Sequence, residues 1–442
     1  MHIKLSDHFT YGKLLRFTLP SVAMMIFTSI YGVVDGFFVS NFVGKTSFAA
    51  VNFIMPFLMI LGAFGFMFGT GGSALVARTM GEGKKEKANR IFSMLTYISA
   101  ALGVLIALLG ILLIRPIAAA LGATGAMLED CVLYGRIILA ALPAFMLQQE
   151  FQSFFVAAEK PQLGLAVTVA AGVANMVLDL LFIAVFKMGV AGAALATAIS
   201  QGVGGIVPFV YFLFPNRSLL RLCRPAFDGR ALLKACTNGS SELMSNISMS
   251  LVGMLYNAQL IRYAGENGVA AYGVLMYVCM IFIAVFIGYS IGTAPVISYH
   301  YGADNYTELK SLLKKSLILI SLFSLVMCLL GEVLAKPLSL LFVGYDAELL
   351  AITLRGFLIF SLSFLFSGLA IYGSGFFTAL NNGLVSALIS FLRTLVFQVA
   401  AILILPLLWQ TDGIWISIVV AEMMAAAVTA FFLLLMRRRY HY

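Results

Sequence analysis

The hydrophobic positions of this chain gather into long runs, and polar residues gather into the short stretches between them. A helix that crosses a bilayer needs about 20 mostly apolar residues to span roughly 30 Å of hydrocarbon. Twelve runs meet this requirement, so the pattern predicts an all-α polytopic membrane protein with twelve transmembrane helices. The runs cover residues 15–39, 48–77, 91–114, 131–157, 164–186, 191–214, 237–261, 271–297, 316–335, 353–377, 384–408 and 414–436.

The charged positions indicate how these helices are oriented. Only 11% of the residues are charged and 62% are hydrophobic, whereas soluble domains have about a quarter charged. Of the 28 Lys and Arg residues, 20 fall in loops on the side of the two termini, and seven fall on the other side. The positive-inside rule then places both termini in the cytoplasm, in a plasma or inner membrane. Because the net charge of +9 follows this loop pattern, we expect a lipid bilayer and no nucleic acid as partner. We also expect no cleaved signal peptide.

The two halves of the chain repeat each other. Identical residues recur in the same order at nearly constant offsets of 221 to 224 positions, close to half the chain. Six helices per repeat preserve orientation, so the halves should be parallel lobes, an arrangement found in transporters. We expect a first lobe at 1–214, a cytoplasmic linker at 215–236 and a second lobe at 237–442. The recurring residues are Ala49, Ala50, Gly71 and Gly81 with Ala270, Ala271, Gly292 and Gly302; Phe154, Phe155 and Ala157 with Phe376, Phe377 and Ala379; and Gly189 with Gly413.

Two acids lie inside apolar runs of the first half. Asp35 and Asp179 should face the interior of the bundle, because an ionised carboxylate in hydrocarbon costs at least a few kcal/mol. Asn175 precedes Asp179 by one helical turn, and Thr197 reaches a similar depth from a third helix. Their oxygen atoms suit a hard cation, and two adjacent carboxylates can instead share a proton. Alternatively, Asn175 and Thr197 only form hydrogen bonds between helices.

Other polar residues in the runs have two interpretations each. Pro20 removes a backbone hydrogen bond from the first helix, either as a static bend or as a hinge. In the second half, Arg393 and Glu422 reach depths at which they can meet, as an ion pair or as substrate contacts, and Glu242 is a further polar contact there. Glu150 lies near the inner end of its run, where we expect interfacial water to solvate it.

Several segments together resemble the multidrug and toxic compound extrusion (MATE) family, closest to its prokaryotic DinF-like branch, which includes MepA-type exporters. The matching segments are YGVVDGFFVSNFVG, AAVNFIMP, GTGGSALVARTMGEGKKEKA, AEKP, NMVLDLLFI and GVAGAALATAISQ. The resemblance implies a twelve-helix antiporter of two lobes that exports organic cations in exchange for H+ or Na+. It also implies that Asp35, Asn175, Asp179 and Thr197 form the coupling site and that Pro20 bends. One departure is the turn at Glu159, where relatives often have an Asp-Gly-Asn-Pro-like stretch.

Two other functions remain in view. A flippase for lipid-linked precursors, from the wider superfamily, should carry several basic residues in its cavity, and only Arg393 is intramembrane. An integral-membrane enzyme would need clustered acids or histidines at one membrane face. We therefore expect a monomeric transporter, no enzyme, with no cofactor and no metal, since the five cysteines lack metal-type spacing. The sequence leaves the substrate and the choice between H+ and Na+ open.

Overall fold

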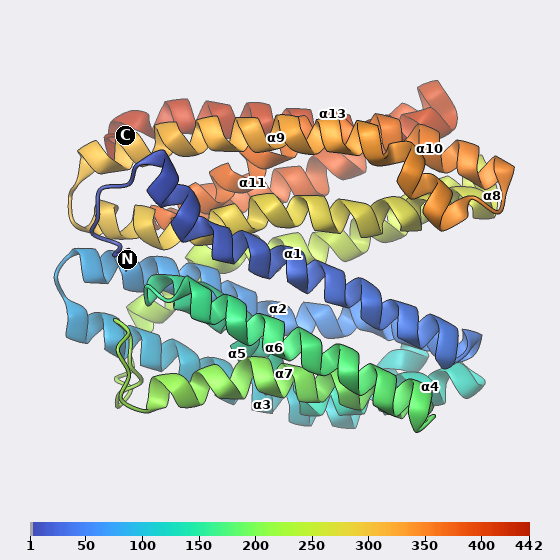
Figure 1. Ribbon diagram of the computed structural model, residues 1–442, viewed down its shortest axis with the longest axis horizontal. Helices are drawn as coiled ribbons and strands as arrows, with labels where there is room; N and C mark the ends of the chain where they lie inside the picture. The colour runs from blue at the N-terminus through green and yellow to red at the C-terminus, as the bar shows by residue number, and fades with distance from the viewer. Residues whose placement is uncertain (1–2) are drawn as a thin grey trace.

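The computed structural model describes residues 3–442, and the described residues are almost entirely helical. Most helices run along one common direction, and the two termini lie at the same end of the bundle, which we call the terminal end (Figure 1). The helices are α1 (Tyr11–Phe42), α2 (Lys45–Gly81), α3 (Lys85–Ala120), α4 (Gly125–Ala140), α5 (Leu142–Ala157), α6 (Pro161–Asp179), η1 (Leu180–Val185), α7 (Gly189–Leu213), α8 (Gly229–Gly302), α9 (Tyr306–Val343), α10 (Ala347–Ser361), α11 (Phe364–Ala379), α12 (Gly383–Phe391), η2 (Leu392–Val396) and α13 (Phe397–Tyr440).

Polar caps begin several of these helices where the apolar runs start. The Thr10 hydroxyl accepts a hydrogen bond from the Lys13 amide at the start of α1. Asp228 caps α8, Asn305 caps α9 and Asp346 caps α10, each through its side-chain oxygen. A capping side chain satisfies a backbone N–H that has no partner inside its own helix. The caps therefore fix where each polar loop becomes a membrane helix.

The helices form the twelve predicted crossings. Eight segments are long and apolar enough to span a bilayer, and two bent pairs, α4 with α5 (55°) and α10 with α11 (50°), bring the number to ten. Two of the eight segments reverse direction inside. The chain turns back at Gly265 (φ 65°) within α8 and at Gln410 (φ 51°) within α13. Each of these segments therefore contributes two crossings, which confirms the predicted all-α fold.

Two groups of helices face each other in the bundle. The blue-to-green helices of the first half and the yellow-to-red helices of the second half form the two groups (Figure 1). An irregular stretch at 214–228 connects them, and the helix of the second half begins at Gly229. A Cβ added at Gly81 would lie 2.0 Å from the Tyr299 carbonyl oxygen, and one at Gly302 would lie 2.1 Å from that of Arg78. Both pairs are related by 221 positions, so α2 and α8 meet through equivalent glycines.

A segment at the N-terminus crosses between the lobes. Residues 3–10, which we call the N-terminal strap, bury Leu5 and Phe9 completely. Glu308 of α9 accepts a hydrogen bond from the Phe9 amide (2.9 Å), and Lys315 donates one to the Phe9 carbonyl (2.5 Å). On the first lobe, the Leu5 amide donates to Glu159 (2.6 Å). The strap thus holds the two lobes together at the terminal end.

Candidate functional site

The first lobe brings α1 close to α6 through a glycine. A Cβ at Gly172 would lie 2.4 Å from the Phe27 ring and 2.9 Å from the Tyr31 ring, so only glycine allows this approach. Asp35 follows Tyr31 by one turn, on the same face of α1. Asn175 and Asp179 follow Gly172 by one and two turns on α6. The close contact therefore carries the polar residues of the two helices toward each other.

The structure places all four predicted residues of the first lobe together. The Asp35 carboxyl interacts with the Asp179 carboxyl and with the Asn175 amide. Thr197 of α7 joins them through Tyr134, whose hydroxyl faces Thr197 as well as both carboxyls. Asp179 is completely buried, and it is the last α-helical residue before the wider turn of η1. Four side chains from three helices thus share one site.

Most side-chain oxygen atoms of this site have no regular hydrogen bond to the protein. Among the described residues, one oxygen of Asp35, both oxygens of Asp179, the Asn175 carbonyl and the Thr197 hydroxyl are buried without a hydrogen bond of regular geometry. No ion pair with a described Lys or Arg reaches either carboxyl. Buried polar groups are nearly always paired, and an unpaired buried charge is expensive. The donor set therefore suits a proton or a small hard cation between the carboxyls.

Two tyrosines belong to the site and were not predicted from the sequence. Tyr134 of α4 is buried and its hydroxyl donates to the Met55 sulfur (3.6 Å). Tyr31 lies beside Asp35 and the Gln148 amide. Aromatic residues are common in membrane helices, so neither stands out by residue type. The spacing of Tyr31 and Asp35, one turn apart, was the available signal.

Both halves of the chain match one known protein family. Residues 20–181 and 243–404 each match the MatE family model. The chain belongs to the MatE family. Its two matched segments are related by 223 positions at both boundaries, in keeping with the predicted parallel repeat. The chain is therefore a multi-span membrane transporter and not an enzyme.

Named relatives and solved MatE structures extend the comparison. The multidrug export protein MepA of Staphylococcus haemolyticus is 26% identical over 366 residues, covering 81% of this chain and 80% of that protein. MepA of Staphylococcus aureus (strain MRSA252) is 24% identical over 423 residues, covering 94% and 91%. A multidrug resistance MATE family transporter in the outward-facing conformation is 25% identical with a TM-score of 0.91, covering 98% and 97%. A MATE structure in the bent conformation has a TM-score of 0.88 at 24% identity, covering 99% and 98%.

The predicted hinge residue Pro20 lies within a continuous helix. Pro20 is inside α1, which stays helical from Tyr11 to Phe42. The residues next to Pro20 pack closely against α8, since a Cβ at Gly288 would lie 2.5 Å from the Val22 Cα. A Cβ at Gly292 would lie 3.0 Å from the Thr18 Cβ. Any bending at Pro20 would therefore move α1 against α8 of the other lobe, and the hinge role stays a prediction.

The polar residues of the second lobe form an ion pair. The Arg393 Nε donates to both Glu422 carboxylate oxygens, at 2.9 and 3.1 Å. Arg393 lies in η2 and Glu422 lies in α13. Glu242 of α8 is close enough to interact electrostatically with Arg393. Of the two predicted interpretations, the contact supports the ion pair. Since its charge is balanced by Glu422, Arg393 does not form the basic cavity expected of a flippase.

The expected solvation of Glu150 is wrong. Its side chain is 0% exposed, and its neighbours Gln148 and Gln149 are 4% and 6% exposed. The sequence placed Glu150 near the end of a helix, but α5 lies in the interior of the lobe, packed on α2, α3 and α7. A Cβ at Gly69 of α2 would lie 3.0 Å from the Glu150 Cα. Neighbouring helices, rather than interfacial water, surround this acid.

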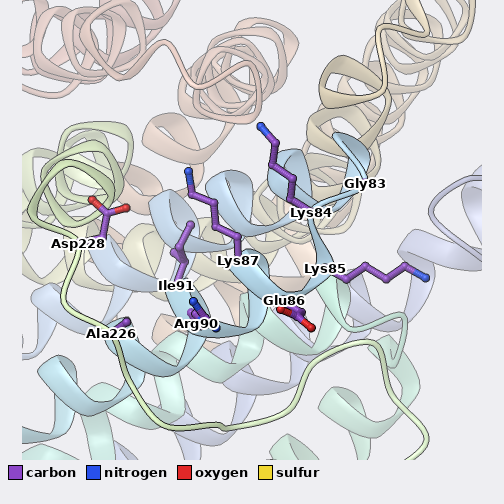
Figure 2. Close-up of a pocket in the computed structure, with 9 residues that line it drawn as sticks. All are labelled: Gly83, Lys84, Lys85, Glu86, Lys87, Arg90, Ile91, Ala226 and Asp228. Atoms are coloured by element: carbon purple, nitrogen blue, oxygen red, sulfur yellow. The ribbon is translucent and has the colours of Figure 1, made fainter.

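A large hollow lies away from the four predicted residues. This cavity of about 650 Å³ opens at the terminal end, between the start of α3 and the connection at 214–228 (Figure 2). Its walls include Lys84, Lys85, Lys87 and Arg90, with Glu86 and Asp228 as the acids. This excess of positive charge repels an organic cation. The cavity is therefore not a candidate substrate site for cations, despite its volume.

Proposed function

We propose that this MatE protein is a secondary active antiporter that exports organic, mostly cationic and amphipathic, drugs or toxic compounds in exchange for H+ or Na+. One observation carries the proposal. Two carboxyls from separate helices, Asp35 and Asp179, face each other inside an apolar lobe without a cationic partner among the described residues. Such a pair has a strong affinity for a positive charge and can take it from a proton, a sodium ion or a drug.

The coupling follows from competition for this pair. An ion that binds Asp35 and Asp179 removes negative charge that an organic cation would use, so ion binding weakens drug binding. Linkage requires that a bound drug weakens ion binding by the same factor. Asn175, Thr197 and Tyr134 supply neutral donors and acceptors around the pair. Ions entering from outside would then release the drug outside, which is the direction of export.

The comparisons support the drug class and the cellular setting. Two relatives bear the name multidrug export protein, and a similar structure is called a multidrug resistance transporter. The basic loops at the terminal end support termini in the cytoplasm of a cell membrane. We further propose that the protein acts as a monomer without a cofactor, because each lobe carries its own polar residues within one chain.

Transport in proteoliposomes tests the proposal. A fluorescent organic cation is followed while pH and Na+ gradients are imposed separately, for the wild type, Asp35→Asn and Asp412→Asn. We expect Asp35→Asn to fold but to lose gradient-driven export, since the amide cannot exchange a proton or hold a cation as a carboxylate does. Asp412 pairs with Arg355 on the surface, so its variant should transport normally because exposed pairs contribute little.

Binding in detergent tests the competition itself. Drug affinity of the wild type should fall as pH drops, or as Na+ is added at fixed pH, and Asp35→Asn should largely lose this dependence. Wild-type export by a folded Asp35→Asn protein would refute the coupling role. An affinity indifferent to both ions would show that coupling is not exerted through these carboxyls.

A further inference from the structure

A second polar cluster lies in the first lobe, in the segment Gln148–Gln152 of α5. Four of these five side chains are polar, and all of them are buried. Few of their polar atoms form hydrogen bonds in the structure. Among the described residues, Gln148 Nε2, Gln149 Oε1, Glu150 Oε2 and both polar atoms of Gln152 lack a hydrogen-bond partner. Since native proteins rarely leave such atoms unpaired, these atoms are suited to bind water or a proton.

Glu150 faces α3 from this segment. The Thr96 hydroxyl lies 3.3 Å from Glu150 Oε1, and the Ser99 hydroxyl also faces the carboxyl. The single hydrogen of Thr96 has a better acceptor in the Phe92 carbonyl, at 2.9 Å. The carboxyl therefore meets weak donors only. An ionised carboxylate with so few donors is expensive in the membrane interior.

No opposite charge compensates Glu150. From α2, α3, α4, α6, α7 and α8, the helices that contact α5, no titratable or charged side chain of the described residues faces this carboxyl, and its side-chain contacts are the Thr96 and Ser99 hydroxyls. No group of three His, Cys, Asp or Glu residues suited to a metal occurs in the described part of the chain. A proton is thus the cation that this environment fits best.

The location of Glu150 connects it to the carboxyl pair. Gln148, two residues earlier, lies beside Tyr31, and Tyr31 lies beside Asp35. In the other direction, α5 ends at Ala157, seven residues beyond Glu150, which is about 10 Å along a helix. Glu150 therefore lies about 10 Å from the terminal end of the lobe, on the same helix as Gln148 but on another face of it, toward α3 rather than α1.

We propose that Glu150 is a second proton-exchanging carboxyl of the first lobe, which takes up the proton that Asp35 and Asp179 release and passes it to water at the terminal end. The inference rests on the proposed function with protons as the coupling ion. In the step, the neutral Glu150 carboxyl gives its proton to a water molecule and becomes a carboxylate, and a proton from the pair restores it. Gln148 and Tyr31 lie beside Asp35, and water molecules would carry the proton from there to Glu150.

A structural role would give a different result from a proton-exchanging role. A permanently neutral Glu150 could serve as a hydrogen-bond donor to Thr96 or Ser99. Glutamine has the same shape and also donates, so Glu150→Gln would then preserve both folding and transport. A proton-exchanging Glu150 cannot be replaced by glutamine, because an amide does not release its hydrogens at accessible pH.

Infrared spectroscopy tests protonation without relying on transport. Purified protein carrying glutamate labelled with carbon-13 at the side-chain carboxyl is measured in lipid nanodiscs while pH is varied. We expect a protonated-carboxyl band that is lost in Glu150→Gln and that disappears from the wild type as pH rises. Glu266→Gln, at an exposed position, should keep the band. A band missing from the wild type, or one that never titrates in the folded protein, would overturn the proposal.

Transport of the same variants tests the role in coupling. We expect Glu150→Gln to bind the fluorescent cation as the wild type does but to lose export driven by a pH gradient, while Glu266→Gln retains it. Export at the wild-type rate by Glu150→Gln would overturn the proposal. A wild type whose export is driven by Na+ and not by pH would exclude the proton as coupling ion and with it this role of Glu150, whereas a wild type without export under either gradient would refute the proposed function. If Glu150→Gln does not fold, Ser99→Ala removes a facing hydroxyl and should shift the band; an unchanged band would count against the assignment.

Discussion

The N-terminal strap leads to a prediction about the balance between the two conformations of a transporter. Opening the terminal end requires the lobes to separate there, because α1 continues directly from the strap while Glu308 and Lys315 belong to α9. The hydrogen bonds of Glu308 to the strap must then break. Replacing Glu308 by alanine removes these bonds in the closed form only. We therefore expect Glu308→Ala to favour the form that is open at the terminal end.

The magnitude follows from the geometry. Glu308 is 7% exposed in its side chain and accepts a bond of 2.9 Å from the buried Phe9 amide. A hydrogen bond to a charged group contributes about 1.5–3 kcal/mol. The second contact, 2.6 Å to His8, adds little because the His8 side chain is 68% exposed. A loss of about 2 kcal/mol changes the ratio of closed to open forms by about 30-fold.

Pulsed electron resonance measures this ratio as a distance distribution. Spin labels are attached to unnatural amino acids at Lys87 and Lys310, which are exposed on opposite lobes at the terminal end, so that the native cysteines stay in place. Glu308→Ala should add a population with a longer distance. Glu348→Ala, at an exposed position on the other end, should leave the distribution unchanged. An identical distribution in Glu308→Ala and the wild type would refute the role of the strap.

Two further variants test how the lobes are built. Gly302→Val should force α8 away from the Arg78 carbonyl oxygen, which would lie 2.1 Å from the added Cβ. Overpacking of this kind costs about 1–3 kcal/mol, so thermal unfolding in detergent should occur at a lower temperature than in the wild type. Gly253→Val, at a glycine without close neighbours, should unfold like the wild type. Arg393→Met leaves Glu422 buried without its partner and should cost about 3–5 kcal/mol. The double variant Arg393→Met with Glu422→Leu should recover most of this loss, and equal destabilisation of both variants would contradict the ion-pair role.

The sequence predicted the features that depend on composition along a single segment. Twelve apolar runs became twelve crossings, because hydrocarbon leaves the backbone no hydrogen-bond partner outside its own helix. The repeat was visible in the sequence because each lobe needs a glycine at the same point, where α2 and α8 cross. A Cβ added at Gly81 or at Gly302 would lie 2.0 or 2.1 Å from a carbonyl oxygen of the facing helix, so both lobes need glycine at that crossing.

The sequence also indicated which polar residues of the first lobe belong together. Asp35, Asn175, Asp179 and Thr197 share a depth in the membrane, and depth follows directly from the position in a run. Depth does not determine which faces of the helices meet. That the four side chains converge depends on the approach of α1 to α6 at Gly172, which is a property of the packed lobe.

Only the tertiary structure decided the environment of the remaining residues. Glu150 lies seven residues from the end of its helix, a distance compatible with interfacial water, yet the surrounding helices enclose it completely. Tyr134 has Asp130 one turn earlier on its own helix, but it acquires its place beside the site carboxyls from α1, α6 and α7. The strap is a short polar stretch whose burial depends on α9, about 300 positions away. Burial and contact are properties of several helices at once, whereas the hydrophobic pattern describes one helix at a time.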